Sequence, residues 1–223
     1  MDFQIDKIYN EDCLEGMKRI ADGAVDCVCT DIPYNEVNRT DNGLRNLDKK
    51  SADIGLFDVA ELTRTLCAKS KGSVYMFCGI NQVSDIRRTM SECNLSTRLL
   101  IWEKTNPSPM NGDKIWLSGI ECCVYGKKSG AVFNEFCKNT VFRYPSGDSN
   151  LHPTQKPLTL IRRLVLASTE MGGVVLDPFM GSGTTAVAAL MEKRHFIGFE
   201  TNREYFDIAQ GRIDQVLRNP TLF

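Results

Sequence analysis

The sequence predicts a doubly wound α/β fold with a mostly parallel sheet, and three observations support this prediction. Short apolar runs rich in β-branched residues alternate with stretches of helical periodicity. One such run, 174–176, leads into a glycine-rich turn and a helix, the arrangement in which parallel sheets bind ligands. The length of 223 residues is enough for one sizeable core. We therefore expect a single domain over residues 1–223.

Apolar periodicity places the expected strands and helices in order. We expect strands at 3–9, 24–30, 73–78, 97–102, 119–125, 174–176 and 195–199. We expect helices at 10–20, 58–70, 82–92, 158–168, 184–193 and 203–217. The strand at 119–125 is expected to pair in a hairpin with a later strand, and 130–150 is expected to be irregular.

Residues at three predicted helix starts indicate how those helices begin. Asn10 or Asp12 is expected to cap the first helix, because both side chains accept hydrogen bonds from backbone N–H groups. Pro157 suits the first position of the helix at 158–168. Thr184 or Thr185 is expected to cap the helix that follows the glycine-rich turn.

Composition argues against several classes of protein. No apolar run approaches the length of a membrane span, and no signal peptide is visible. Nine cysteines are scattered without a C-x-x-C pair, and only two histidines occur, so we expect reduced thiols in a cytoplasmic protein and no metal site. The net charge is −1, so any nucleic-acid surface must be local. Residues 104–163 carry such a local excess of basic side chains.

The stretch 174–185 has the pattern of a cofactor site. Gly181 and Gly183 allow a sharp turn and a close backbone approach to a ligand. The strand at 195–199 ends at Glu200, where a carboxylate can accept both hydroxyl groups of a ribose. Asp177 precedes the glycines, and its carboxylate suits a cationic amino acid better than a pyrophosphate. The pattern predicts a nucleoside-bearing cofactor at the carboxyl edge of the sheet.

A second group of residues, Asp31-Ile-Pro-Tyr34, follows the strand at 24–30. The Asp31 carboxylate can accept one N–H of an exocyclic amine, and the Ile32 carbonyl can accept the other. Pro33 restricts residue 32 to extended backbone angles and so helps to aim that carbonyl. Tyr34 offers a flat face on which an extruded base can stack. The structural alternative is a strand-end turn with a buried tyrosine.

The glycine-rich turn also has alternative interpretations. One is an ordinary turn between a strand and a helix. Another is the dinucleotide fingerprint, which Gly181-x-Gly183-x-x-Ala186 also fits and which would indicate an oxidoreductase. The oxidoreductase interpretation lacks a motif for a hydride partner, and it does not explain Asp31-Ile-Pro-Tyr34.

Three motifs together carry a family resemblance. Asp31-Ile-Pro-Tyr34, His152-Pro-Thr-Gln-Lys-Pro157 and Asp177-Pro-Phe-Met-Gly-Ser-Gly183 resemble the motifs of the amino-group DNA methyltransferases. Their order resembles the beta class, in which the catalytic tetrapeptide precedes the S-adenosylmethionine motif. The resemblance covers the chain from Asn10 to about Arg212. It implies a Rossmann-like, S-adenosylmethionine-dependent methyltransferase fold with permuted motif order.

The resemblance also implies a role for each matching residue. Asp177 to Gly183 hold the methionine part of the cofactor, Glu200 binds the ribose, and Lys156 with Pro157 closes over the cofactor. Asp12 and Cys13 lie near the adenine, although Asn10-Glu11 departs from the usual residues before them. The catalytic residues are Asp31, Ile32, Pro33 and Tyr34. The cofactor-binding residues are Asp12, Cys13, Lys156, Pro157, Asp177, Phe179, Gly181, Gly183, Thr184 and Glu200.

The implied mechanism is direct methyl transfer to a base flipped out of DNA. The base stacks on Tyr34, while Asp31 and the Ile32 carbonyl hold its amine, and the amine nitrogen attacks the sulfonium methyl. Catalysis is then mostly proximity and orientation, worth roughly 7–11 kcal/mol in favourable cases. Ile32 replaces the first proline of the usual tetrapeptide, so we expect activity with slightly looser positioning.

An initial aspartate resembles adenine-N6 enzymes more than cytosine-N4 enzymes. We therefore expect a site-specific DNA adenine-N6 methyltransferase that uses S-adenosylmethionine. The alternatives are a cytosine-N4 DNA methyltransferase and a DNA-binding relative that no longer methylates.

Little of the chain is left for recognition of a DNA sequence, because only a short segment separates Tyr125 from His152. We expect double-stranded DNA to contact loops near 35–55 and 104–152. The expected phosphate contacts are Arg39, Arg45, Lys49, Lys50 and Lys104. So small a recognition surface favours a homodimer. No nuclease motif is visible, which is consistent with a solitary enzyme or with the partner of a separate restriction endonuclease.

Overall fold

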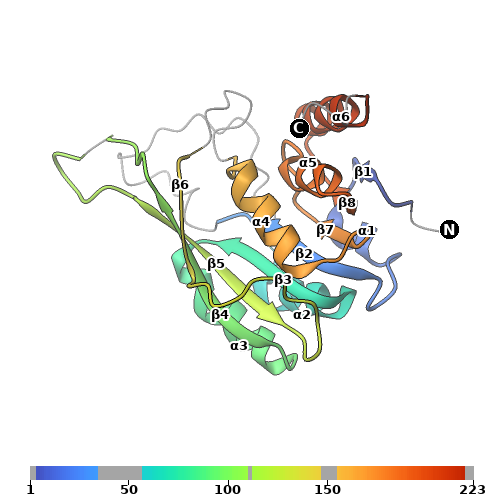
Figure 1. Cartoon of the computed structure of the whole chain (residues 1–223), viewed down its shortest axis with the longest axis horizontal. Helices are drawn as coiled ribbons and strands as arrows, with labels where there is room; N and C mark the ends of the chain where they lie inside the picture. Colours follow the sequence, from blue (N-terminus) through green and yellow to red (C-terminus); the bar gives the residue numbers. More distant parts are fainter. Residues whose placement is uncertain (1–3, 35–56, 110–111, 147–154, 219–223) are drawn as a thin grey trace.

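The computed structural model describes residues 4–34, 57–109, 112–146 and 155–218 (Figure 1). In chain order the elements are β1 (Lys7–Tyr9), α1 (Cys13–Met17), β2 (Val25–Asp31), α2 (Val59–Lys69), β3 (Ser70–Cys78), η2 (Ile80–Gln82), α3 (Val83–Glu92), β4 (Ser96–Lys104), β5 (Ile120–Lys127), β6 (Val141–Tyr144), α4 (Leu158–Ser168), β7 (Val174–Asp177), α5 (Thr184–Met191), β8 (His195–Phe199) and α6 (Arg203–Arg218). The loop expected at 35–55 lies outside the described residues.

The strands of the described residues form one eight-stranded sheet in the order β1-β8-β7-β2-β3-β5-β4-β6. β5 runs antiparallel to its two neighbours, β3 and β4. The other neighbouring pairs are parallel. The prediction of a doubly wound, mostly parallel α/β fold is therefore confirmed.

The strand order reverses between β2 and β7. These strands are parallel neighbours, with Cys27 opposite Val175 and Val28 opposite Leu176. From β2 the chain continues through α2 to β3 on one side, and from β7 it continues through α5 to β8 on the other. Connections that diverge in this way leave a crevice outside the carboxyl ends of the two strands, where doubly wound sheets bind ligands.

Helices cover both faces of the sheet and make three layers (Figure 1). Buried residues of α4, α5 and α6 share one core cluster with Cys27 and Tyr75. Buried residues of α1, α2 and α3 share the other cluster with Val28 and Val74. Successive strand residues therefore face opposite cores, as the pleat requires. Of the helices described, none is long and apolar enough to cross a membrane.

Two strand predictions were wrong. β5 pairs with the earlier strands β3 and β4, not in a hairpin with a later strand. β6 lies in the stretch expected to be irregular and pairs in parallel with β4, with Trp102 opposite Phe142. The Trp102 indole N–H also donates to the Tyr144 carbonyl (2.9 Å). β6 has only four residues, and none of their side chains is fully buried, so the apolar run in this strand is too short to distinguish from a loop.

The start of α1 is capped by Asp12 and not by Asn10. The Asp12 carboxylate accepts hydrogen bonds from the N–H groups of Leu14 (2.8 Å) and Glu15 (3.1 Å). The Asn10 amide instead donates to the Glu200 carbonyl (2.8 Å), 190 positions away in the chain. That contact joins the end of β1 to the end of β8.

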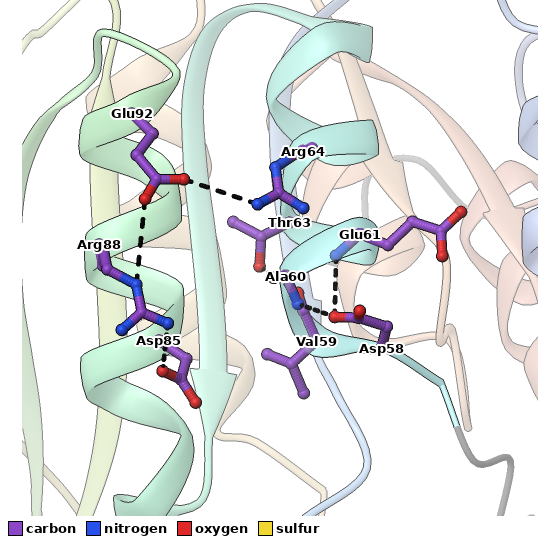
Figure 2. A network of polar contacts seen from close by, with 9 residues as sticks. All are labelled: Asp58, Val59, Ala60, Glu61, Thr63, Arg64, Asp85, Arg88 and Glu92. Carbon is purple, nitrogen blue, oxygen red and sulfur yellow. Dashed lines mark hydrogen bonds and ion pairs between the residues drawn. The ribbon is translucent and has the colours of Figure 1, made fainter.

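The helices α2 and α3 lie side by side, and the ion pair of Arg64 with Glu92 joins their exposed sides (Figure 2). Glu92 lies 3.6 Å from Arg64 and 3.9 Å from Arg88. Asp58 caps α2 by accepting the N–H groups of Ala60 and Glu61. Because exposed ion pairs are worth less than about 1 kcal/mol each, packing of the buried helix faces holds this layer.

Candidate active site

The two predicted motifs meet at the crevice between β2 and β7. Asp31 is the last residue of β2, and Asp177 is the last residue of β7. The charge of Asp31 contributes to the raised pKa of Asp177, so the two carboxylates lie within electrostatic reach of each other. The Asp31–Tyr34 tetrapeptide and the glycine-rich turn therefore lie close together at the same edge of the sheet.

Hydrogen bonds from β3 and η2 hold the backbone of the tetrapeptide. The Ile32 N–H donates to the Phe77 carbonyl (3.1 Å), and the Ile32 side chain is buried. A proline at this position has no N–H to donate, so isoleucine adds an anchor where we expected looser positioning. The Pro33 carbonyl accepts from the Gln82 amide (3.1 Å), whose oxygen accepts from the Gly79 N–H (2.8 Å).

Four charged side chains form a cluster at the end of β2. The Lys156 ammonium lies 2.5 Å from the Asp31 carboxylate and 3.0 Å from the Glu121 carboxylate. Lys104 lies 2.7 Å from the other oxygen of Glu121. All four side chains are largely buried, Lys156 most of all at 6% exposed. Two carboxylates and two ammonium groups give no net charge, and charges tolerate burial only when they are paired in this way.

The cluster changes how two predicted residues are interpreted. Lys156, which we expected to close over the cofactor, contacts Asp31 of the tetrapeptide. Lys104, which we expected to contact phosphate, pairs with Glu121 and lies 5.2 Å from the ring centre of Trp102, so its charge is neutralised within the protein.

Sequence reasoning missed Glu121 and Gln82. An acid inside the apolar run 119–125 was a usable signal, because carboxylates are seldom buried without a partner. Gln82 gave no comparable signal, since it lies at the start of a predicted helix like any other polar residue.

Burial and charge pairing set the protonation of the cluster. Burial raises the pKa of the Asp31 carboxyl, and the attraction of Lys156 only partly opposes it. Burial lowers the pKa of Lys156, but Asp31 and Glu121 outweigh burial, so the net change is upward. Burial raises the pKa of Glu121, but Lys156 and Lys104 outweigh burial and lower it. Lys156 therefore remains an ammonium ion at neutral pH.

Tyr34 lies beside the same cluster. Its hydroxyl donates to the Glu121 carboxylate (3.3 Å), and the Lys156 ammonium lies 5.6 Å from the centre of its ring. Burial, and then repulsion from Asp31 and Glu121, raises the pKa of Tyr34. The phenol therefore stays neutral and keeps its proton for donation.

Carboxylates also organise the glycine-rich turn. The Glu200 carboxylate accepts from the N–H groups of Gly181 (2.7 Å) and Asn202 (2.9 Å). The buried Asp177 carboxylate accepts from the Phe179 N–H (3.1 Å). Asp177 at the end of β7 and Glu200 just after β8 therefore both contact the same turn.

The cap of α5 is Gly183, so the prediction of Thr184 or Thr185 was wrong. Gly183 has a φ of 84°, in the left-handed region that glycine adopts without steric cost. Thr184 is the first residue of the helix. Arg212 of α6 donates to the Thr184 hydroxyl (3.4 Å) and to the Ser182 carbonyl (2.5 Å), which ties the turn to the last helix.

We expect Gly183→Ala to destabilise the protein by about 1–3 kcal/mol. The new Cβ would need a left-handed backbone and would lie 3.0 Å from the Cβ of Ala209. Gly181→Ala is the matched control, because Gly181 also has a positive φ but an added Cβ would meet nothing within 4 Å. Urea unfolding should show the larger loss for Gly183→Ala, and equal losses would contradict this packing argument.

The other predicted residues lie at the margins of the site or outside the described residues. Cys13 is buried at the start of α1, and burial, followed by the charge of Asp12, raises its pKa to about 12. Pro157 is the N-cap of α4 and not its first residue, and it directly follows Lys156. The expected phosphate contacts outside the described residues are Arg39, Arg45, Lys49 and Lys50.

Comparisons with known proteins find similar DNA methyltransferases. A family model described as DNA methylase, of the N6 and N4 methyltransferases, matches residues 111–211. The type II methyltransferase M2.MboI of Moraxella bovis is 26% identical over 95% of this chain and 90% of its own length. The type II methyltransferase M.HinfI of Haemophilus influenzae is 28% identical over 97% of this chain and 70% of its own length.

Solved structures of DNA methyltransferases are also similar to this chain. The complex of M1.HpyAVI with S-adenosylmethionine superposes with a TM-score of 0.74 at 29% identity, over 93% of this chain and 98% of that one. The cytosine-N4-specific PvuII DNA methyltransferase shares the fold with a TM-score of 0.71 at 18% identity, over 96% of this chain and 91% of that one. The chain is therefore similar to the amino-group DNA methyltransferases over most of its length, which identifies S-adenosylmethionine as its cofactor.

Proposed function

We propose that this protein methylates DNA at the exocyclic N6 of adenine after base flipping. The observation that carries the proposal is the Asp31 carboxylate at the crevice between β2 and β7. Its Oδ1 atom is buried and has no hydrogen-bond partner among the residues that the structure describes. A buried acceptor without a partner costs free energy, and an N–H of an exocyclic amine would satisfy it.

The surrounding backbone supports recognition of an amine. Phe77 holds the N–H of Ile32, and Gln82 holds the carbonyl of Pro33, so the peptide groups on both sides of the Ile32 carbonyl are fixed. In this proposal Asp31 and the Ile32 carbonyl accept the two N–H groups of the target amine, and the ring of Tyr34 is the stacking surface. Acceptors that are already anchored need no rearrangement when the base arrives, which is how orientation contributes to rate.

The glycine-rich turn fits S-adenosylmethionine. Gly181 has a φ of 52°, and an added Cβ there would meet nothing within 4 Å, so the backbone of the turn faces open space. We propose that Asp177 binds the ammonium group of the cofactor and that Glu200 binds its ribose. The other proposed contacts are Asp12, Cys13, Lys156, Pro157, Phe179, Gly183 and Thr184. When bound, this cofactor supplies the sulfonium methyl group that is transferred.

Adenine is the proposed base because the tetrapeptide begins with aspartate. Cytosine N4 is the second candidate, because the PvuII enzyme that shares this fold is cytosine-N4-specific. Both bases present an exocyclic amine, and Asp31 with the Ile32 carbonyl provides acceptors that suit either one. The discrimination therefore has to come from the shape of the pocket around the rest of the base.

Double-stranded DNA is the proposed substrate, contacted by the loops near 35–55 and 104–152. The connection between β4 and β5 extends away from the sheet (Figure 1) and carries Trp116, which is 95% exposed. Exposed apolar side chains of this kind are used by proteins that contact the stacked bases of DNA. We also propose that the protein forms a homodimer, because its own recognition surface is small. A separate restriction endonuclease is a further proposed partner, which the type II classification of its relatives favours.

The test is incubation of the purified protein with labelled S-adenosylmethionine and mixed-sequence DNA, followed by mass spectrometry of the nucleosides. We expect N6-methyladenine. Detection of N4-methylcytosine would retain the mechanism and replace the base. Absence of any methylated nucleoside, with the cofactor bound, would contradict the proposed activity.

A further inference from the structure

Gln82 is a buried polar residue that binds two separate segments of the backbone. It is the last residue of η2, and it is only 5% exposed. Its amide oxygen accepts the N–H of Gly79 (2.8 Å), and its amide nitrogen donates to the carbonyl of Pro33 (3.1 Å). One side chain therefore joins the turn after β3 to the tetrapeptide after β2.

A side-chain amide suits this bridge because it carries a donor and an acceptor at a fixed spacing. The opposite orientation of the Gln82 amide would place its oxygen against the Pro33 carbonyl and its NH₂ group against the Gly79 N–H. Only one orientation therefore satisfies both contacts. A buried amide that is bound in this way is held rigidly, and its removal would take a hydrogen bond from each of two backbone groups.

The contact with Pro33 determines how the chain enters Tyr34. The Pro33 carbonyl and the Tyr34 nitrogen belong to one planar peptide group, so a fixed carbonyl fixes that whole group. The turn after β3 also packs against Tyr34. A Cβ added to Gly79 would lie 3.5 Å from the Cβ of Tyr34 and 3.7 Å from its Cγ. Gln82 thus binds both the peptide that leads into Tyr34 and the backbone that lies against it.

The far end of the Tyr34 side chain is held as well. Its hydroxyl donates to the Glu121 carboxylate (3.3 Å). The ring is therefore positioned from its backbone by Gln82 and from its hydroxyl by Glu121. A ring held at both ends keeps one orientation before a base arrives, and this is the condition under which a stacking surface contributes to orientation.

We infer that Gln82 is a positioning residue for methyl transfer, which holds the Tyr34 ring in the orientation that stacks on the flipped base. The inference rests on the proposed function. Gln82 acts through the backbone of the tetrapeptide and needs no contact with the base or the cofactor. Its loss should therefore slow the transfer step and leave the binding of both substrates almost unchanged.

The first variant is Gln82→Met, which removes both hydrogen bonds and keeps an unbranched side chain of similar length. We expect the single-turnover rate of methyl transfer to fall about tenfold or more, because a small displacement of a positioned group can cost about 100-fold. The Kd for S-adenosylmethionine and the Kd for mixed-sequence DNA should each stay within about twofold of the wild type.

The second variant, Gln82→Glu, separates the two contacts. Its carboxylate can still accept the Gly79 N–H and so keeps the turn after β3 closed, but when ionised it cannot donate to the Pro33 carbonyl. We expect the same loss of rate as for Gln82→Met, measured at about pH 8, well above the ordinary pKa of glutamate, about 4.3.

The matched control is Tyr75→Phe. It removes another buried hydrogen bond of β3, between the Tyr75 hydroxyl and Ser168 Oγ (2.7 Å). Ser168 is the last residue of α4, at the opposite end of that helix from the site. Thermal unfolding is recorded for every variant. Tyr75→Phe should lose stability as the Gln82 variants do and keep the wild-type rate of transfer.

The outcomes separate a positioning role from a structural one. Slower transfer by both Gln82 variants, with unchanged affinities for cofactor and DNA, supports the inference. Wild-type transfer by either folded variant overturns it. A loss of cofactor affinity that matches the loss of rate also overturns it, because Gln82 would then support the whole site. An equal loss of rate in Tyr75→Phe, or failure of both Gln82 variants to fold, assigns Gln82 to stability alone and overturns it too. Absence of transfer by the wild-type protein overturns the proposed function, and this inference with it.

Discussion

Replacing Asp31 with alanine is expected to lower the rate of methyl transfer by about 10³-fold. The carboxylate is the buried acceptor that the proposed function assigns to the target amine, and its Oδ1 has no partner among the described residues. Loss of that acceptor removes both the orientation of the amine and the negative charge beside it. The measurement is single-turnover transfer of labelled methyl groups to DNA.

Two controls make the Asp31 result specific. Titration calorimetry should show that Asp31→Ala binds S-adenosylmethionine within about twofold of the wild type, because Asp177 and Glu200, the proposed partners of its ammonium group and its ribose, lie at the ends of two other strands, β7 and β8. Asp85→Ala removes an exposed acid of α3 and should transfer normally. Transfer at the wild-type rate by a folded Asp31→Ala protein would exclude this residue from the chemistry.

Replacing Asp177 with alanine is expected to weaken binding of S-adenosylmethionine by about 100-fold, as when a buried charge pair loses one partner. Asp177 is buried at the end of β7, and the proposal pairs its carboxylate with the ammonium group of the cofactor. Titration calorimetry at pH 7 measures the effect. Asp26→Ala is not a suitable control, because Asp26 accepts the N–H of Val174 and so supports β7 itself. Glu192→Gln is the control, because it removes an acid that pairs with Arg162 (2.6 Å) outside the proposed site.

Asp177 should also make the binding of the cofactor depend on pH. Burial raises the pKa of Asp177 from 3.8 to about 6, against hydrogen bonds from Thr185, Thr30 and the Phe179 N–H that lower it. Only the ionised carboxylate attracts a cation, so the affinity for S-adenosylmethionine should rise as the pH increases through about 6. Asp177→Asn should abolish this rise, and a rise that persists in the variant would assign the titration to another group.

The free protein should show the opposite trend in stability. Because the pKa is higher in the folded state than in the unfolded state, Asp177 binds its proton more tightly when folded between pH 4 and 6. Proton binding by Asp177 therefore stabilises the folded state fully below the pKa of the unfolded state. This stabilisation, about 3 kcal/mol, is lost as the pH rises through the pKa of the folded state. Urea unfolding should show that the free energy of unfolding of Asp177→Asn rises, relative to that of the wild type, between pH 4 and 7.

Much of the fold was predictable because its signals are local. The unit of β7, the glycine-rich turn and α5 combines a β-branched run, two glycines and a helix within 174–191. Each of these features depends on residues that are neighbours in the chain. β6 was missed because it is only four residues long, Val141–Tyr144, although three of these residues are good strand formers. Its pairing with β4 defines it as a strand.

The cap of α5 shows the limit of residue preferences. Threonine is a good helix cap, yet the chain enters α5 through Gly183 at a φ of 84°. The packing of that residue against Ala209 of α6 leaves space for a glycine and little for a side chain. Packing against α6 therefore explains why Gly183, and not Thr184 or Thr185, is the N-cap of α5.

The motifs at Asp31–Tyr34 and Asp177–Gly183, and the order of the strands and helices that carry them, could be read from the amino-acid sequence because adjacent residues define them. The contacts between them required the folded chain. Lys156 reaches Asp31 across 125 positions, and Glu121 joins both Lys156 and Lys104, although no periodicity links these residues. Charged groups separated in sequence meet only where the sheet brings strand ends together, and their burial there decides which charges are neutralised and which remain available to a ligand.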